Sequence, residues 1–221
     1  MPLQNRVTPW GALVAVPERG LFMGNRGCLH DQQRHVVRAW ARLPWVTCLL
    51  DFKGRRRELM APGNYTELFF LDEATALAAG HRPCATCRRE AYGTFKELWT
   101  AANPQLAGRT DGSINAIDRQ LHAERVDANG RKRTWSAVLG GLPDGVVVAL
   151  AQDAEPLLVR RGYLHPWLPG GYGSPVNADP QTRVLVLTPL SLTRMLAHGY
   201  VPQLHPSIEG GRLRMAANEL D

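Results

Sequence analysis

The residues best suited to chemistry are four cysteines and a neighbouring histidine. Cys84 and Cys87 form a C-x-x-C pair, and Cys28 and His30 place a thiolate and an imidazole two residues apart. Zinc takes four such ligands in a tetrahedron, commonly as two close pairs from separate segments. Cys48 lies within an apolar run and is expected to be a small core residue. The spacing therefore predicts a zinc site formed by Cys28, His30, Cys84 and Cys87.

The Cys84–Cys87 pair has two alternative interpretations, a thioredoxin-like redox pair or two buried thiols. A redox pair is expected between a strand and a long helix of a βαβ unit. The sequence around Cys84 lacks that pattern, so redox chemistry is disfavoured.

A second set of candidate site residues combines His122 and Glu124 with the C-x-x-C pair. In zinc nucleobase deaminases a histidine and two cysteines hold the metal, and the glutamate moves protons for the bound water. Here the order of the two motifs is inverted. If residues 114–126 form one helix, the side chains of residues 122 and 124 point about 200° apart. A zinc hydrolase acting on a nucleobase or nucleoside is therefore the alternative function.

Asp118, His122 and Arg125 follow helical spacing and form one polar stripe. The stripe is either a solvated face or the lining of a cleft. In a cleft, His122 is a candidate general base held by Asp118.

The charge of the chain is concentrated in its first half. The net charge is +6, with 15 basic and 9 acidic residues in positions 1–110 and 11 of each in positions 111–221. A localised basic surface attracts polyanions, so nucleic acid or a nucleotide-like ligand is the expected partner. The forked donors of arginine suit phosphate oxygens. The predicted phosphate contacts are Arg26, Lys53, Arg55, Arg56, Arg57, Arg82, Arg88 and Arg89. For residues 55–57 a solvated hairpin tip is an equal alternative.

Residues 163–173 combine aromatic side chains with glycine and proline. Such a loop can present a platform on which a base stacks, with His165, Trp167 and Tyr172 as the candidates. An ordinary packed loop is the alternative interpretation.

Hydrophobic periodicity and capping residues predict the elements that carry these groups. Asp72 is expected to cap a short helix that ends at Gly80. Further helices are predicted over 87–102, 114–126 and 188–199. Strands are predicted over 11–16, 45–52, 65–71, 146–150, 156–160 and 183–187.

Residues 69–92 resemble the second half of the zinc-binding domain of Ada-type DNA repair proteins. The shared pattern is an aromatic strand, a short helix, the run from Gly80 to Pro83 and the cysteine pair. The resemblance implies that Cys84 and Cys87 bind zinc on a module associated with nucleic acid.

In that family a C-x-x-x-C supplies the other two ligands, one of which accepts a methyl group from a DNA phosphotriester. This chain has Cys28 and His30 instead, after a longer spacer. Three thiolates and one imidazole carry less negative charge than four thiolates, so the sulfurs are expected to be poorer nucleophiles. The zinc is therefore expected to be structural.

Together these features predict an α+β protein of two lobes in contact. Residues 1–105 form an Ada-like zinc lobe of mixed strands and helices with a basic surface, and residues 111–221 form a β-rich lobe. The leading hypothesis is a zinc-binding protein of DNA or RNA repair or processing; a protein-interaction module is a further alternative. An apolar run of membrane-spanning length and a secretory signal pattern are both missing, so we expect a cytoplasmic location without membrane contact.

Overall fold

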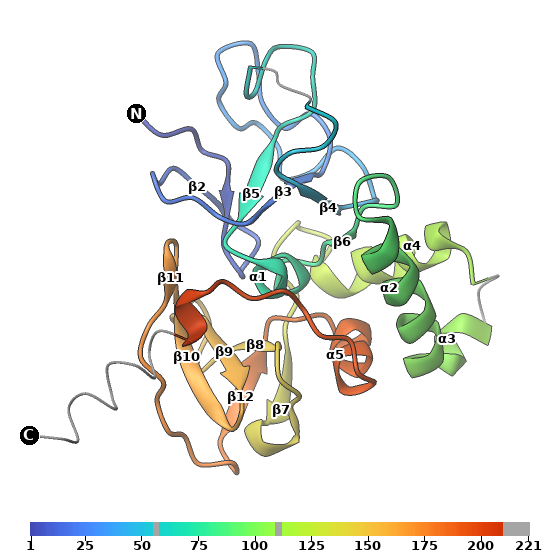
Figure 1. Ribbon diagram of the computed structural model, residues 1–221, viewed down its shortest axis with the longest axis vertical. Helices are drawn as coiled ribbons and strands as arrows, with labels where there is room; N and C mark the ends of the chain where they lie inside the picture. Colours follow the sequence, from blue (N-terminus) through green and yellow to red (C-terminus); the bar gives the residue numbers. More distant parts are fainter. Residues whose placement is uncertain (55–57, 109–111, 210–221) are drawn as a thin grey trace, which may run out of the picture.

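The computed structural model describes residues 1–54, 58–108 and 112–209. These residues form a mixed α+β structure with two six-stranded sheets (Figure 1). The predicted α+β class is therefore confirmed.

The first sheet is mixed and runs in the order β2-β1-β5-β3-β4-β6. Two of its pairings are parallel, β1 with β5 and β4 with β6, and the others are antiparallel. Its strands are β1 (Arg6–Val7), β2 (Leu13–Val14), β3 (Phe22–Asn25), β4 (Val46–Leu49), β5 (Leu68–Phe70) and β6 (Arg82–Pro83).

The second sheet is antiparallel throughout and runs in the order β11-β10-β9-β8-β12-β7. Its strands are β7 (Trp135–Val138), β8 (Val147–Ala149), β9 (Leu157–Arg160), β10 (Tyr163–Leu168), β11 (Gly171–Tyr172) and β12 (Arg183–Val186). A 3-10 turn, Leu139–Gly141, follows β7.

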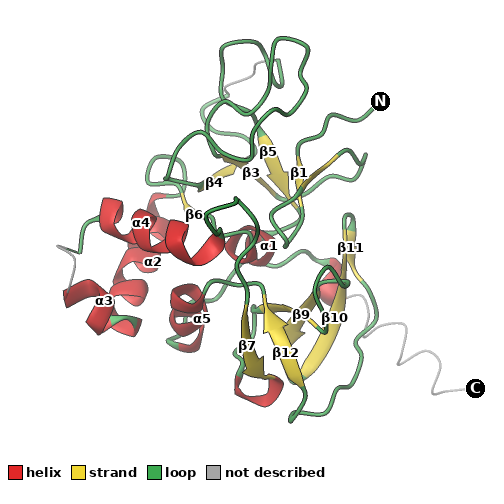
Figure 2. Ribbon diagram, turned by 180° about the vertical axis from the view of Figure 1, so that it is seen from behind, coloured by secondary structure: helices red, strands yellow, loops and turns green. Residues whose placement is uncertain are grey.

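Four helices gather on one side of the molecule (Figure 2). They are α2 (Arg89–Ala102), α3 (Pro104–Gly108), α4 (Ile114–Arg125) and α5 (Leu190–Ala197). Phe95 and Trp99 of α2 and Ile117 of α4 are fully buried in one core cluster with Val148 and Val186 of the second sheet. The helices that follow the cysteine pair therefore share their core with the second sheet.

Helix α1 (Glu73–Ala78) lies between the two sheets (Figure 1) and is buried along its whole length. Asp72 caps it by accepting a hydrogen bond from the Thr75 backbone N–H, and Gly80 follows it with a φ of +85°. A Cβ at Gly80 would lie 2.6 Å from Cδ of Arg125, so this position needs glycine both for its backbone and for its side-chain neighbour.

The predicted stacking loop is a β-hairpin made of β10 and β11. His165, Trp167 and Tyr172 are each 8% exposed. The Trp167 indole donates to Oγ1 of Thr75 at 3.0 Å, and the Tyr172 hydroxyl donates to Oδ2 of Asp72 at 2.8 Å. The two rings fix the start of α1 and belong to the core, so the expectation of a base-stacking platform is corrected.

Candidate metal centre and cationic cleft

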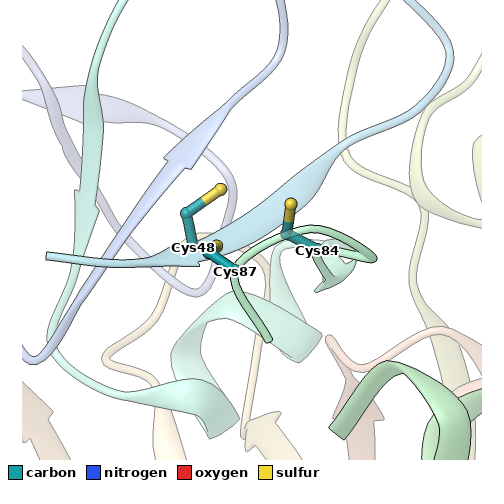
Figure 3. A group of neighbouring side chains, drawn as sticks. All are labelled: Cys48, Cys84 and Cys87. Carbon is teal, nitrogen blue, oxygen red and sulfur yellow. The ribbon is translucent and has the colours of Figure 1, made fainter. Parts of the chain in front are cut away.

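Three cysteines from two separate segments lie together. Cys48 lies on β4, and Cys84 and Cys87 lie on the turn between β6 and α2 (Figure 3). Their sulfur atoms all lie within 4.8 Å of one another, and each side chain is half-buried. Among the described residues, no other histidine, cysteine, aspartate or glutamate joins this group.

The register of two parallel strands brings the cysteines together. Val46 of β4 pairs with Arg82 of β6, and the Cys84 N–H donates to the Thr47 carbonyl at 2.9 Å. This pairing places Cys84 beside Cys48. The chain then turns, with the Arg88 N–H bonded to the Cys84 carbonyl at 3.0 Å, and the turn brings Cys87 to the same place.

The surroundings of Cys84 favour a thiolate. Hydrogen bonding from the Cys48 thiol, aided by backbone N–H groups of Cys87 and Thr86, lowers the pKa of Cys84 to about 4 despite partial burial. The Thr86 N–H lies 3.4 Å from this sulfur. Hydrogen bonding to the Cys84 sulfur raises the pKa of Cys48, and burial and the Cys84 charge raise that of Cys87, so metal binding would release their protons. Cysteine sulfur suits zinc, and three such ligands leave one tetrahedral position for water or a ligand group. The donor set therefore fits a zinc ion.

Cys28 and His30 are not part of the cluster, which corrects half of the predicted ligand set. Both ring nitrogens of His30 are engaged: Nδ1 lies 2.6 Å from Oγ1 of Thr66, and Nε2 lies 3.3 Å from the Ala61 carbonyl. Cys28 donates to the His30 carbonyl at 3.6 Å. These two residues stabilise the loop after β3, and Cys48 takes their place at the cysteine cluster.

Neither His122 nor Glu124, the residues of the hydrolase hypothesis, joins the cysteine cluster. Oε2 of Glu124 accepts hydrogen bonds from the hydroxyl and N–H of Ser191, at 2.7 and 3.1 Å. Nδ1 of His122 lies 3.0 Å from a guanidinium nitrogen of Arg125, and its ring packs edge-on against Trp40. No histidine belongs to the cysteine group, so the His-Cys-Cys arrangement of the deaminase signature is not formed among the described residues.

Asp118 does not hold His122. It is 2% exposed and forms a two-point ion pair with Arg82, with both nitrogen–oxygen distances at 2.7 Å. Arg88 is buried in the same manner, with its guanidinium 2.8 Å from Oε1 of Glu73 and stacked on Phe22. The two carboxylates therefore neutralise Arg82 and Arg88 inside the protein. The prediction that these arginines contact phosphate does not hold.

Two other predicted phosphate contacts are exposed. Arg89 lies at the start of α2, and Lys53 lies in the loop after β4 with its ammonium 5.5 Å from the ring centre of Phe52. Arg55, Arg56 and Arg57 lie outside the described residues.

Arg26 belongs to a different group of cations, of which two are buried and one, Lys132, is half-buried. Arg26 is 1% exposed, as is Arg125, and both guanidinium groups stack on the indole of Trp45, at 4.0 and 3.8 Å from its ring centre. Lys132, on the turn after α4, donates to the Ala78 carbonyl at the end of α1. We call Arg26, Arg125 and Lys132 the cation cluster.

Burial and mutual repulsion act on the whole cation cluster. Desolvation lowers the pKa of both arginines, and desolvation together with Arg26 and Arg125 lowers that of Lys132 to about 7. His81 accepts a hydrogen bond from Nε of Arg26 at 3.2 Å, and burial with the neighbouring cations lowers its pKa well below the usual value. His81 is therefore neutral and adds no charge to the cluster.

The cation cluster borders a cleft of about 830 Å³ with a small pocket beside it. Arg26 and Lys132 line both spaces, and Arg125 lines the smaller one. Apolar side chains form part of the cleft wall, and Asp127 and Asp153 are the acidic residues among the described lining. The apolar lining includes Trp10, Leu13 and Val36.

Sequence reasoning did not place Cys48 in the metal cluster or Lys132 at the cleft, whereas a cleft lining was one of the two alternatives for Arg125. Cys48 is half-buried within a strand where Thr47 is buried and Leu49 exposed, and only the parallel pairing with β6 shows its role. Lys132 followed an Asn-Gly turn, where a charge is ordinary. The Asn-Gly turn itself could have indicated the position of Lys132, because a tight turn brings the chain back to the end of α4, where Lys132 pairs with Val126.

Comparison with known proteins finds no matching family model, curated protein or solved structure. In the described part of the chain, no helix has the length and apolar character needed to cross a membrane.

Proposed function

We propose that this chain is a zinc-binding protein associated with nucleic acid or a nucleotide-like ligand, and that Cys48, Cys84 and Cys87 hold the ion. The observation that carries the zinc part is the convergence of three sulfur atoms, within 4.8 Å of one another, from β4 and from the turn before α2. Neighbouring thiolates repel one another, and a divalent cation offsets that repulsion. The ion would join the first sheet to the segment that leads into α2.

The nucleic-acid part is supported by the excess of basic residues in the first half and by the resemblance of residues 69–92 to the Ada-type zinc domain. The ion is proposed to bear one non-protein ligand, because three cysteines fill three of the four tetrahedral positions. A position of this kind also favours the second candidate, a zinc-dependent hydrolase, in which the fourth ligand is an activated water. Glu124 is not proposed as its proton carrier, because it is not part of the cysteine group and its carboxylate accepts hydrogen bonds from Ser191.

Metal analysis of cysteine variants tests the zinc proposal. Wild-type protein purified without chelator is expected to carry about one zinc ion per chain, and Cys48→Ser should lose most of it. Cys28→Ser is the matched control and should keep the metal, because Cys28 lies outside the cluster. Metal-free wild-type protein, or zinc loss in Cys28→Ser with retention in Cys48→Ser, would overturn the assignment.

X-ray absorption at the zinc edge tests the coordination. Three sulfur neighbours and one lighter atom are expected, at about 2.3 Å and 2.0–2.2 Å. Four sulfur neighbours would bring Cys28 back into the site and exclude the open position.

A further inference from the structure

We propose that the cation cluster of Arg26, Arg125 and Lys132 is a binding site for the phosphate group of a ligand that enters the adjoining cleft. The proposal is independent of the zinc assignment. It adds a specific phosphate site to the proposed association with nucleic acid. It rests on that proposed function only for the identity of the molecule that carries the phosphate.

The first step of the argument is the missing countercharge. Among the described residues, none of the three side chains forms an ion pair with a carboxylate. The acid whose charge acts on Arg125 is Asp118, and it is already paired with Arg82. Burying an unpaired charge is costly, so an external anion would stabilise two buried arginines and a half-buried lysine that have no carboxylate beside them.

The second step is what holds the cations in place. Neutral main-chain carbonyls accept most of their hydrogen bonds: Gly11 from Arg26 at 3.0 Å, Gly80 and Leu43 from Arg125 at 2.9 and 2.6 Å, and Ala78 from Lys132. Carbonyl dipoles orient a cation and leave its net charge unchanged. The cluster is therefore preorganised and remains positively charged.

The third step is the unused donors. Nη2 of Arg26 and Nε of Arg125 are buried and have no hydrogen-bond partner among the described residues. Guanidinium donors match phosphate oxygens in geometry, and the stacking of both groups on Trp45 keeps their planes fixed. A buried donor without a partner needs one, and a phosphate oxygen at the edge of the cleft can supply it, since Arg26 lines that cleft.

The cleft itself indicates the class of ligand. Its volume of about 830 Å³ is within the range of small-molecule sites and exceeds what a bare phosphate requires. Trp10 lines both the cleft and the small pocket, and its indole N–H donates to the Ala154 carbonyl at 3.0 Å, so the ring is held in place. A phosphate ester that carries a ring, such as a nucleotide unit, fits this combination of cations and an aromatic wall.

Calorimetry with anions at constant ionic strength tests the proposal. Inorganic phosphate and sulfate are expected to bind wild-type protein, and Lys132→Met should weaken both at least tenfold. Lys96→Met, at an exposed position on α2, is the matched control and should bind as the wild type does. Absence of binding beyond that of chloride, or equal binding by Lys132→Met, would overturn the proposal.

A second readout does not depend on the variant folding. Bound phosphate should slow the reductive methylation of Lys132 in wild-type protein, followed by mass spectrometry, and leave Lys96 unaffected. Equal methylation rates of Lys132 with and without saturating phosphate would contradict the site.

The source of the phosphate is distinguished by two further probes, a nucleoside monophosphate and a single-stranded oligonucleotide. Tighter binding of the monophosphate than of inorganic phosphate, lost in Lys132→Met, supports a nucleotide ligand. Competition between the oligonucleotide and phosphate, weakened by the same variant, supports nucleic acid. Zinc content is measured in every sample, so failure of this site and failure of the zinc proposal give separate results.

Discussion

The protein buries two groups of arginines, and the groups differ in the side chains that surround them. Arg82 and Arg88 each meet a carboxylate, Asp118 and Glu73, at 2.7 and 2.8 Å. The cation cluster lies at the end of α1 and has carbonyl groups and an indole ring around it, with no carboxylate bonded to it in the described part of the chain.

The two groups differ in whether their positive charge is neutralised within the fold or can act on a bound ligand. A buried arginine paired with a carboxylate on a neighbouring element holds those elements together and presents no net charge to a ligand. A buried cation without such a partner costs stability and offers an anion a preorganised site. The same residue type, at similar burial, therefore serves two purposes.

The largest effect is expected from breaking a paired arginine. Arg82→Met leaves the Asp118 carboxylate buried without its partner, and we expect a loss of about 3–5 kcal/mol in the free energy of unfolding. Urea denaturation measures it. Arg89→Met, at an exposed position of α2, is the control and should change the free energy by at most about 0.5 kcal/mol. Equal stability of the two variants would show that the ion pair has no structural role.

A gain in the free energy of unfolding, rather than a loss, is expected from a substitution in the cation cluster. Lys132→Met removes a desolvated charge beside two like charges and also the hydrogen bond to the Ala78 carbonyl. The first effect is the larger, so the ligand-free protein should gain about 1 kcal/mol. Urea denaturation in chloride buffer without phosphate measures the change, with Lys96→Met as control. A large loss of stability in Lys132→Met would mean that the lysine is a structural cap of α1.

The same lysine predicts a dependence of stability and anion binding on pH. The pKa of Lys132 is lowered from 10.5 to about 7, so the folded protein loses this proton as the pH rises through 7 while the unfolded chain keeps it up to about 10.5. Stability of the ligand-free protein should therefore rise with pH between these values. Sulfate affinity should fall over the same range, by at most about tenfold per pH unit for one proton.

Calorimetry with sulfate, whose charge is constant over this range, measures the pH effect, and Lys132→Met should lose the dependence. Arg26, Arg125 and neutral His81 face Lys132 within the protein, and the cleft wall adds Asp127 and Asp153, together with Arg38 and Arg131. All of these remain in the variant. A pH profile unchanged in Lys132→Met would assign the titration to one of them.

Local structure was largely predictable from the sequence. Asp72 caps α1 and Gly80 follows it in the left-handed region, as predicted from their residue types. The predicted helix 114–126 is α4, Ile114–Arg125, and the helix 87–102 begins two residues later than expected, at Arg89. Caps, turns and hydrophobic periodicity act over a few residues, so they can be read from the chain directly.

Strand partners were not predictable. β1 and β6 have two residues each, and β3 has four with a glycine among them, so none gives a hydrophobic pattern long enough to recognise. The aromatic segment 163–173 was expected to be a loop because of its glycines and prolines, and it pairs as β10 and β11. Strand pairing depends on contacts between distant segments, which local composition does not encode.

The sequence by itself determined the C-x-x-C pair, the capped helix before it and the basic character of the first half. Tertiary structure alone decided which cysteine joins that pair, because the parallel register of β4 and β6 brings Cys48 to Cys84 across 36 residues of chain. It also decided which arginines are neutralised. A charge is available to a ligand only when no carboxylate from elsewhere in the fold reaches it, and that depends on how distant segments pack.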